Sequence, residues 1–104
     1  MGLDPSHNGP VLLALLATST TAAKVLDSGR ANDFPPGIGR KGVWITNEDA
    51  TISVRLGDAS ANLTTTNGLR LPPGQRVWLD WTLGDYWYVI AESGTPNIGR
   101  LVVT

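Results

Sequence analysis

The chain has no cysteine and only one histidine, His7, among its 104 residues. The lack of cysteine excludes thiolate metal sites and cysteine catalysis. A Ser-His-Asp triad would have to recruit His7 from a terminal segment rich in glycine and proline, and no serine lies in a nucleophile-elbow pattern. The sequence therefore predicts a protein that is not an enzyme and that uses no cofactor.

The chain also has no large excess of either charge, because eight Lys and Arg nearly balance nine Asp and Glu and leave a net charge of −1. The basic residues are scattered one or two at a time, which argues against a nucleic-acid partner. The apolar run at residues 11–17 has seven residues. A membrane span needs about 20, so we expect no membrane partner.

The acidic residues allow two alternatives that must be weighed against plain surface roles. Glu48 and Asp49 in one turn, with Asp58 nearby, could hold a calcium ion. Asp80 and Asp85 flank a hairpin and could form a glycosidase pair. Acidic turns and solvated surfaces explain both patterns more simply, so the sequence predicts neither a metal site nor catalytic residues.

Most of the chain follows the two-residue alternation of β-strands. In residues 43–46, Val43 and Ile45 lie on one face while Trp44 and Thr46 lie on the other. Turn residues separate such segments every eight to twelve residues, for example Asn67-Gly68 and the Pro-Pro-Gly at residues 72–74. Residues 1–10 read as an extended arm and residues 28–39 as a long loop.

This spacing predicts an all-β fold. We expect one antiparallel β-sandwich of jelly-roll or Greek-key type over residues 11–104, preceded by the arm. About eight short strands are expected, at residues 11–17, 22–26, 41–47, 51–57, 69–71, 75–81, 86–91 and 100–104.

Large aromatics are the positive signal in the sequence. If Val43, Ile45, Val77 and Leu79 face the core, Trp44 and Trp78 must face outward. Clustered outward aromatics usually mark a partner surface, although loops or the arm could instead cover them within the monomer. The candidate interaction residues are Phe34, Trp44, Trp78, Tyr86, Trp87 and Tyr88.

Both protein and sugar could bind such a surface. Carbohydrate-binding modules on β-sandwiches also present aromatic faces with polar groups beside them, and Arg76 and Asp80 flank Trp78 in this way. A carbohydrate-binding module therefore stays open as an alternative function.

The order of short motifs over residues 18–104 resembles that of small phage virion accessory proteins. It comprises an Arg-Lys pair at residues 40–41 before a strand that ends in Asn, a strand that ends in Leu-Gly at residues 56–57, a Gly-x-x-Leu-x-x-Gly turn at residues 68–74, a strand at residues 89–91 and a final valine-rich strand. This chain departs from the pattern in its loop at residues 31–39 and its tryptophan content.

The resemblance implies a non-enzymatic β-sandwich that decorates the virion, most simply a capsid decoration (cement) protein on the capsid surface. Its expected partners are the major capsid protein and copies of itself, arranged as a homotrimer that hides the aromatics. A tail or fibre attachment module is the alternative within structural proteins.

Overall fold

The computed structural model describes residues 10–27, 30, 33, 42–80 and 87–103. No helix occurs within these ranges. Nine strands do: β1 Pro10–Leu12, β2 Leu16–Ala17, β3 Ala23–Lys24, β4 Gly42–Asn47, β5 Val54–Gly57, β6 Leu69–Leu71, β7 Arg76–Asp80, β8 Tyr88–Ala91 and β9 Asn97–Val103.

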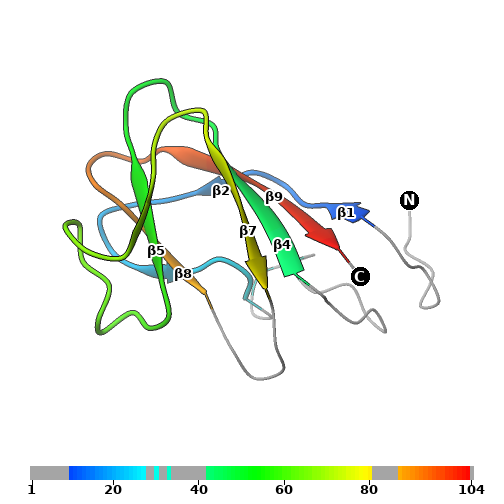
Figure 1. Ribbon diagram of the computed structural model, residues 1–104, viewed down its shortest axis with the longest axis horizontal. Coiled ribbons are helices and arrows are strands. Elements are labelled where there is room, and N and C mark those ends of the chain that lie inside the picture. Colours follow the sequence, from blue (N-terminus) through cyan, green and yellow to red (C-terminus); the bar gives the residue numbers. More distant parts are fainter. Residues whose placement is uncertain (1–9, 28–29, 31–32, 34–41, 81–86, 104) are drawn as a thin grey trace.

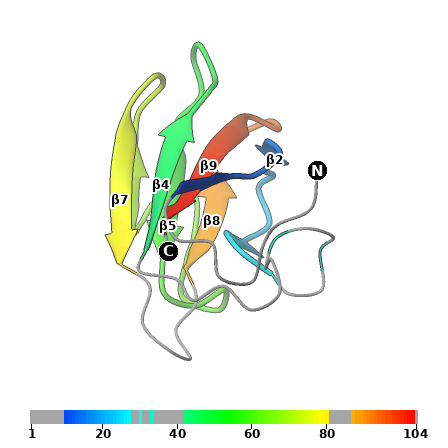
Figure 2. The same cartoon turned by 90° about the vertical axis from the view of Figure 1, so that its right-hand side faces the viewer.

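The strands form two antiparallel sheets packed face to face (Figures 1 and 2). Sheet A has the order β1-β9-β4-β7, with β2 also paired to β9, and sheet B has the order β3-β8-β5-β6. The first strands pair with the last one, β3 with β8, β4 with β7, and β5 with β6. This nested pairing is a long hairpin ribbon folded over on itself, which is the jelly-roll arrangement. The expected fold class is confirmed.

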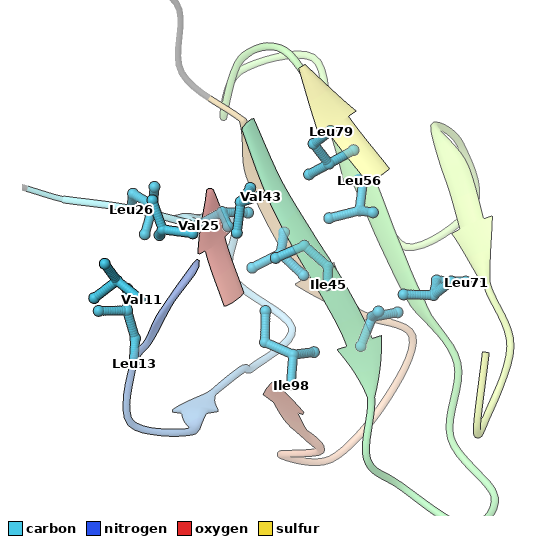
Figure 3. Packing of buried hydrophobic residues seen from close by; sticks show 13 residues of the cluster. Val11, Leu13, Val25, Leu26, Val43, Ile45, Leu56, Leu71, Leu79 and Ile98 are labelled. Carbon is cyan, nitrogen blue, oxygen red and sulfur yellow. The ribbon is translucent and has the colours of Figure 1, made fainter. Parts of the chain in front are cut away.

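The core lies between the sheets and is built from the apolar half of each alternation (Figure 3). Val43 and Ile45 of β4 and Leu79 of β7 meet Val54 and Leu56 of β5, and all five are buried. Burial of one such side chain stabilises the fold by roughly 1.5–3 kcal/mol. The alternation therefore sets which face of each strand is left for other contacts.

The strand boundaries differ from the sequence expectation at both ends of the chain. Residues 11–17 form two strands, β1 and β2, because residues 13–15 leave the ladder while both pieces still pair with β9. Pro10, assigned to the arm from sequence, opens β1 opposite Val103. Strand β9 starts at Asn97 instead of residue 100, because the bend of the chain at residues 92–94 is complete before Asn97.

Asn47 fixes the corner where β4 ends, and it is fully buried. Its Nδ2 donates to the carbonyl oxygens of Ile52 (2.9 Å) and Leu71 (3.0 Å), and its Oδ1 accepts from the N–H of Asp49 (3.0 Å). Its carbonyl accepts from the N–H of Gly74, whose positive φ of 75° favours glycine. One side chain thus ties β4 to β6 in the other sheet.

A buried ion pair joins β9 to the segment that follows β3. Arg100 lies on the inner face of β9, and its Nη1 donates to Asp33 Oδ2 (3.0 Å) and to the carbonyl of Val25 (2.9 Å). Asp33 Oδ2 also accepts from Arg30 Nη1 at 2.7 Å. Arg100 Nε is buried and finds no hydrogen-bond partner among the described residues. This cluster replaces apolar packing at one end of the core.

Across the described ranges, no helix is long and apolar enough to cross a membrane.

Candidate functional site

The outer face of sheet A carries an apolar row that crosses the whole sheet. Leu12 of β1 lies opposite Leu101 of β9, Leu101 lies opposite Trp44 of β4, and Trp44 lies opposite Trp78 of β7. Directly opposed residues point to the same face. With strands about 4.8 Å apart, the row spans roughly 14 Å. Leu12 is 79% exposed and Trp44 is 40% exposed, so this row meets solvent in the monomer.

The neighbouring row of the same face is apolar or small over three of its four strands. Pro10, Val103, Gly42 and Asp80 are opposed in register across β1, β9, β4 and β7. A Cβ at Gly42 would fall 2.7 Å from Cη2 of Trp78, which shows that the Trp78 ring leans over this glycine. Only Asp80, at the margin, is charged. We call the two rows together the apolar face.

The two tryptophans of the apolar face pack against each other, but they do not form a flat platform. Their ring centroids are 5.3 Å apart and the ring planes are tilted by 58°. Arg76 lies over Trp44 with its guanidinium carbon 5.7 Å from the ring centroid, a cation–π contact. Trp78 Nε1 donates to Asp80 Oδ1 at 2.8 Å. The polar groups nearest the rings are thus engaged with the rings themselves.

The outer face of sheet B has the opposite character. Glu92 Oε2 accepts from Arg55 Nε and from Arg70 Nε, both at 2.9 Å. Hydrogen bonds from Arg70, and then the charges of Arg70 and Arg55, hold the pKa of Glu92 below its ordinary value. Arg70 has its pKa raised by the same contact. This part of the face is charged, whereas Ile90, which lies opposite Arg55 on the same face, is buried. The outer face of sheet B therefore carries ion pairs where that of sheet A carries an apolar row.

The structure brings together only some of the candidate interaction residues. Trp44 and Trp78 lie side by side on the apolar face. Trp87 is half-buried, packs against the core and donates from Nε1 to the carbonyl of Asp80 (2.8 Å), so its ring is largely covered within the monomer. Tyr88 alternates with the core residue Val89 and therefore lies on the outer side of sheet B. Phe34 and Tyr86 lie outside the described residues.

Leu12 and Leu101 also belong to the apolar face, and neither could be identified from the sequence pattern. Leu12 sits in a continuous apolar run, where alternation cannot show which side chains face out. Leu101 sits in the valine-rich last strand, with the same difficulty. The signal that identifies them is the register of β1 and β9 against β4, which only the fold supplies.

Asp49, one of the acidic residues weighed as a calcium ligand, has a structural role. Asp49 Oδ2 accepts from the N–H groups of Thr51 (2.9 Å) and Ile52 (2.7 Å), and these bonds lower its pKa. Its carboxylate therefore closes its own turn. No group of three or more His, Cys, Asp or Glu side chains in the described ranges could hold a metal ion. His7 and Asp85 lie outside those ranges.

An open hollow lies where the edges of the two sheets meet at the β6–β7 turn. Its lining includes the apolar residues Leu69, Leu71 and Val77 and the basic residues Arg70 and Arg76. The lining residues include no carboxylate, imidazole or hydroxyl side chain.

Comparison of the chain with protein-family models, with curated proteins and with solved structures finds no match. A jelly-roll fold hosts many unrelated functions, so function has to be argued from the apolar face.

Proposed function

We propose that this chain is a structural protein of a phage virion, a capsid decoration protein that docks on the head through the apolar face of sheet A and stabilises the shell between major capsid subunits. The observation that carries the proposal is the difference between the two outer faces. One presents Leu12, Leu101 and Trp44 in a single row, while the other presents the Arg55–Glu92–Arg70 ion pairs.

Covering the apolar face with a partner is energetically favourable. Removing an exposed leucine or tryptophan side chain fully from water stabilises a complex by roughly 1.5–3 kcal/mol. Aromatic residues are enriched in protein–protein interfaces, and charged residues are depleted at interface centres. The row has no charge within it, and its charged neighbours Arg76 and Asp80 lie at the β7 margin, which matches an apolar centre with a polar rim.

Decoration needs only modest contacts per copy. Many copies on a symmetric shell bind the assembled state and not the dissociated subunits, so mass action shifts the shell toward assembly. A face that buries one row of side chains on each of many sites is sufficient for this mechanism, and it requires no catalytic group.

A sugar ligand is less well supported by the same geometry. A pyranose ring stacks on a flat aromatic face, whereas the Trp44 and Trp78 rings are tilted by 58°. The indole N–H of Trp78 is already donated to Asp80. The resemblance to phage accessory proteins supports the virion over a sugar, and a tail or fibre site remains the competing position on the particle.

Binding to particles that lack the protein tests the proposal. Leu12→Ser and Trp44→Ser should each weaken binding by roughly ten-fold or more, because each removes an apolar side chain from the interface. Leu69→Ser is the matched control: Leu69 is 49% exposed but belongs to sheet B, and its loss should leave binding unchanged. Equal binding by all three variants, binding to tails alone, or saturable binding on a glycan array would reject a head-decoration role.

A further inference from the structure

Strand β7 is an open edge of the sandwich. It ends the order of sheet A, so no described strand pairs with its far side. Figure 2 shows it at the outer margin of the sheet, beyond β4. At five residues it is the longest of the strands that end a sheet. An edge of this kind is a template for pairing with another chain.

The register shows which backbone groups face that open side. Asn47 N–H donates to the carbonyl of Gln75, so the bonded pairs of β4 and β7 continue at Ile45–Val77 and Val43–Leu79. The N–H and C=O groups of the alternate residues, Arg76, Trp78 and Asp80, therefore point away from β4. The Trp87 indole bond to the Asp80 carbonyl agrees with this direction. That carbonyl keeps a second lone pair for another donor.

The side chains of β7 read as a charge-reversed palindrome around Trp78. Arg76 and Asp80 lie two residues either side of it on the outer face, and Val77 and Leu79 lie one residue either side on the inner face. In an antiparallel pair of two β7 strands centred on Trp78, each Arg76 would oppose an Asp80, each Val77 a Leu79, and the two Trp78 rings each other. Every cross-strand pair is then a favourable one.

From this pattern we infer that two copies of the chain pair through β7, antiparallel and about a two-fold axis at Trp78, so that their A sheets join into one continuous sheet. The Trp78 ring leans over Gly42 and the guanidinium of Arg76 lies over Trp44, so neither side chain covers the open side of β7. The Trp87 indole does reach that side, where it donates to the Asp80 carbonyl. Pairing would therefore add a second donor at this carbonyl and turn Arg76 from Trp44 toward Asp80 of the second copy.

The other sheet-ending strands are less suited to the same contact. Pro10 in β1 has no N–H to donate. Strand β3 has two residues, one of them Lys24, and lysine on an edge disfavours pairing. A two-fold pair of β6 strands would place Arg70 opposite Arg70, and like charges directly opposed are destabilising. Of these four strands, β7 alone has length, free donors and complementary charge together.

The dimer would extend the apolar face without covering it. Edge pairing uses the side of β7, so the outer rows of the two copies would run on across the axis and offer one doubled surface. Two linked faces on one particle gain affinity through effective concentration. Dimerisation itself requires no capsid, so measurements in solution test it independently of the particle-binding experiment.

Charge reversal tests the inference with the full chain. Sedimentation at tens of micromolar should give twice the 11.0 kDa chain mass for the wild type. Arg76→Asp alone and Asp80→Arg alone each oppose like charges twice and should raise the dimer Kd by on the order of ten- to a hundred-fold. An equimolar mixture of these two single variants should dimerise again, because each cross-strand pair then joins opposite charges. Arg70→Asp is the control on β6 and should dimerise like the wild type.

Amide hydrogen exchange tests the dimer in the wild-type protein, so this measurement does not require the charge variants to fold. In the wild type, the N–H groups of Arg76 and Trp78 should become more protected as the protein concentration rises through the Kd, while those of Arg70 and Leu69 should not. A wild-type monomer at tens of micromolar, a trimer mass, or a dimer that is indifferent to both reversals would overturn the inference.

Discussion

Removing the Asp33 carboxylate should be among the most damaging changes to this fold. Asp33 and Arg100 have side chains only 4% and 3% exposed, and they are 3.0 Å apart. Asp33→Ala leaves the Arg100 guanidinium buried without its carboxylate, beside an Nε that already lacks a described partner. Breaking one side of a buried pair costs about 3–5 kcal/mol. Against a total stability of about 5–15 kcal/mol, that loss is large.

Urea denaturation followed by tryptophan fluorescence measures this cost. For a domain of this size, a loss of about 3 kcal/mol should lower Tm by at least about 12 °C. The double variant Asp33→Ala/Arg100→Met should lose less than the sum of the two single losses, because it removes both buried charges together. Glu92→Gln, which breaks the ion pairs on the outer face of sheet B, is the control and should cost far less.

A loss of stability below about 1 kcal/mol in Asp33→Ala would contradict this expectation. It would mean that water reaches Arg100 and that the cluster behaves like a surface ion pair. Additive losses in the double variant would also contradict it, because they would show that the two charges do not interact.

Three further predictions follow from other contacts. Asn47→Ala should lower the free energy of unfolding in urea by about 2–4 kcal/mol, because it leaves buried backbone groups without hydrogen-bond partners. Asn47→Asp should be at least as destabilising, because a carboxylate cannot donate to the two carbonyl oxygens that accept from Nδ2. Gly42→Ala should cost about 1–3 kcal/mol and shift tryptophan fluorescence, because its Cβ would lie 2.6 Å from the Leu79 carbonyl oxygen and displace the Trp78 ring. The pKa of Glu92 is lower in the folded than in the unfolded chain. Its carboxylate therefore stabilises the fold fully at pH values above its unfolded pKa, and this stabilisation is lost as the pH falls through its folded pKa. Glu92→Gln should be less stable than the wild type at neutral pH, and that difference should vanish in acid.

Alternation in the sequence was enough to predict the layers of the sandwich. Val43 and Ile45 are buried and Trp44 is exposed, as strand periodicity requires when one face is apolar. Gly68, the second residue of the Asn67-Gly68 turn pair, and Gly74 take positive φ values of 82° and 75°. Local chemistry decides such features, so a single sequence reveals them.

Features that depend on distant residues could not be predicted in this way. Arg100 and Asp33 are 67 positions apart in the chain, and nothing near either residue signals a buried pair. Ser53 alternates with the core residue Val54, which by periodicity alone would place it on the outer, exposed side, yet it is buried. Its carbonyl accepts from the N–H of Glu92. The charge pattern of β7 is visible in the sequence, but the pairing order alone shows that β7 is an edge.

A reconstruction of the particle with this protein bound would show which face of the sandwich meets the shell. We expect the outer side of sheet A, with Leu12 and Trp44, to lie against the shell, while Arg70 and Glu92 of sheet B face solvent. Density that places Arg70 and Glu92 against the shell and leaves Trp44 in solvent, or density on the tail with an undecorated head, would contradict it.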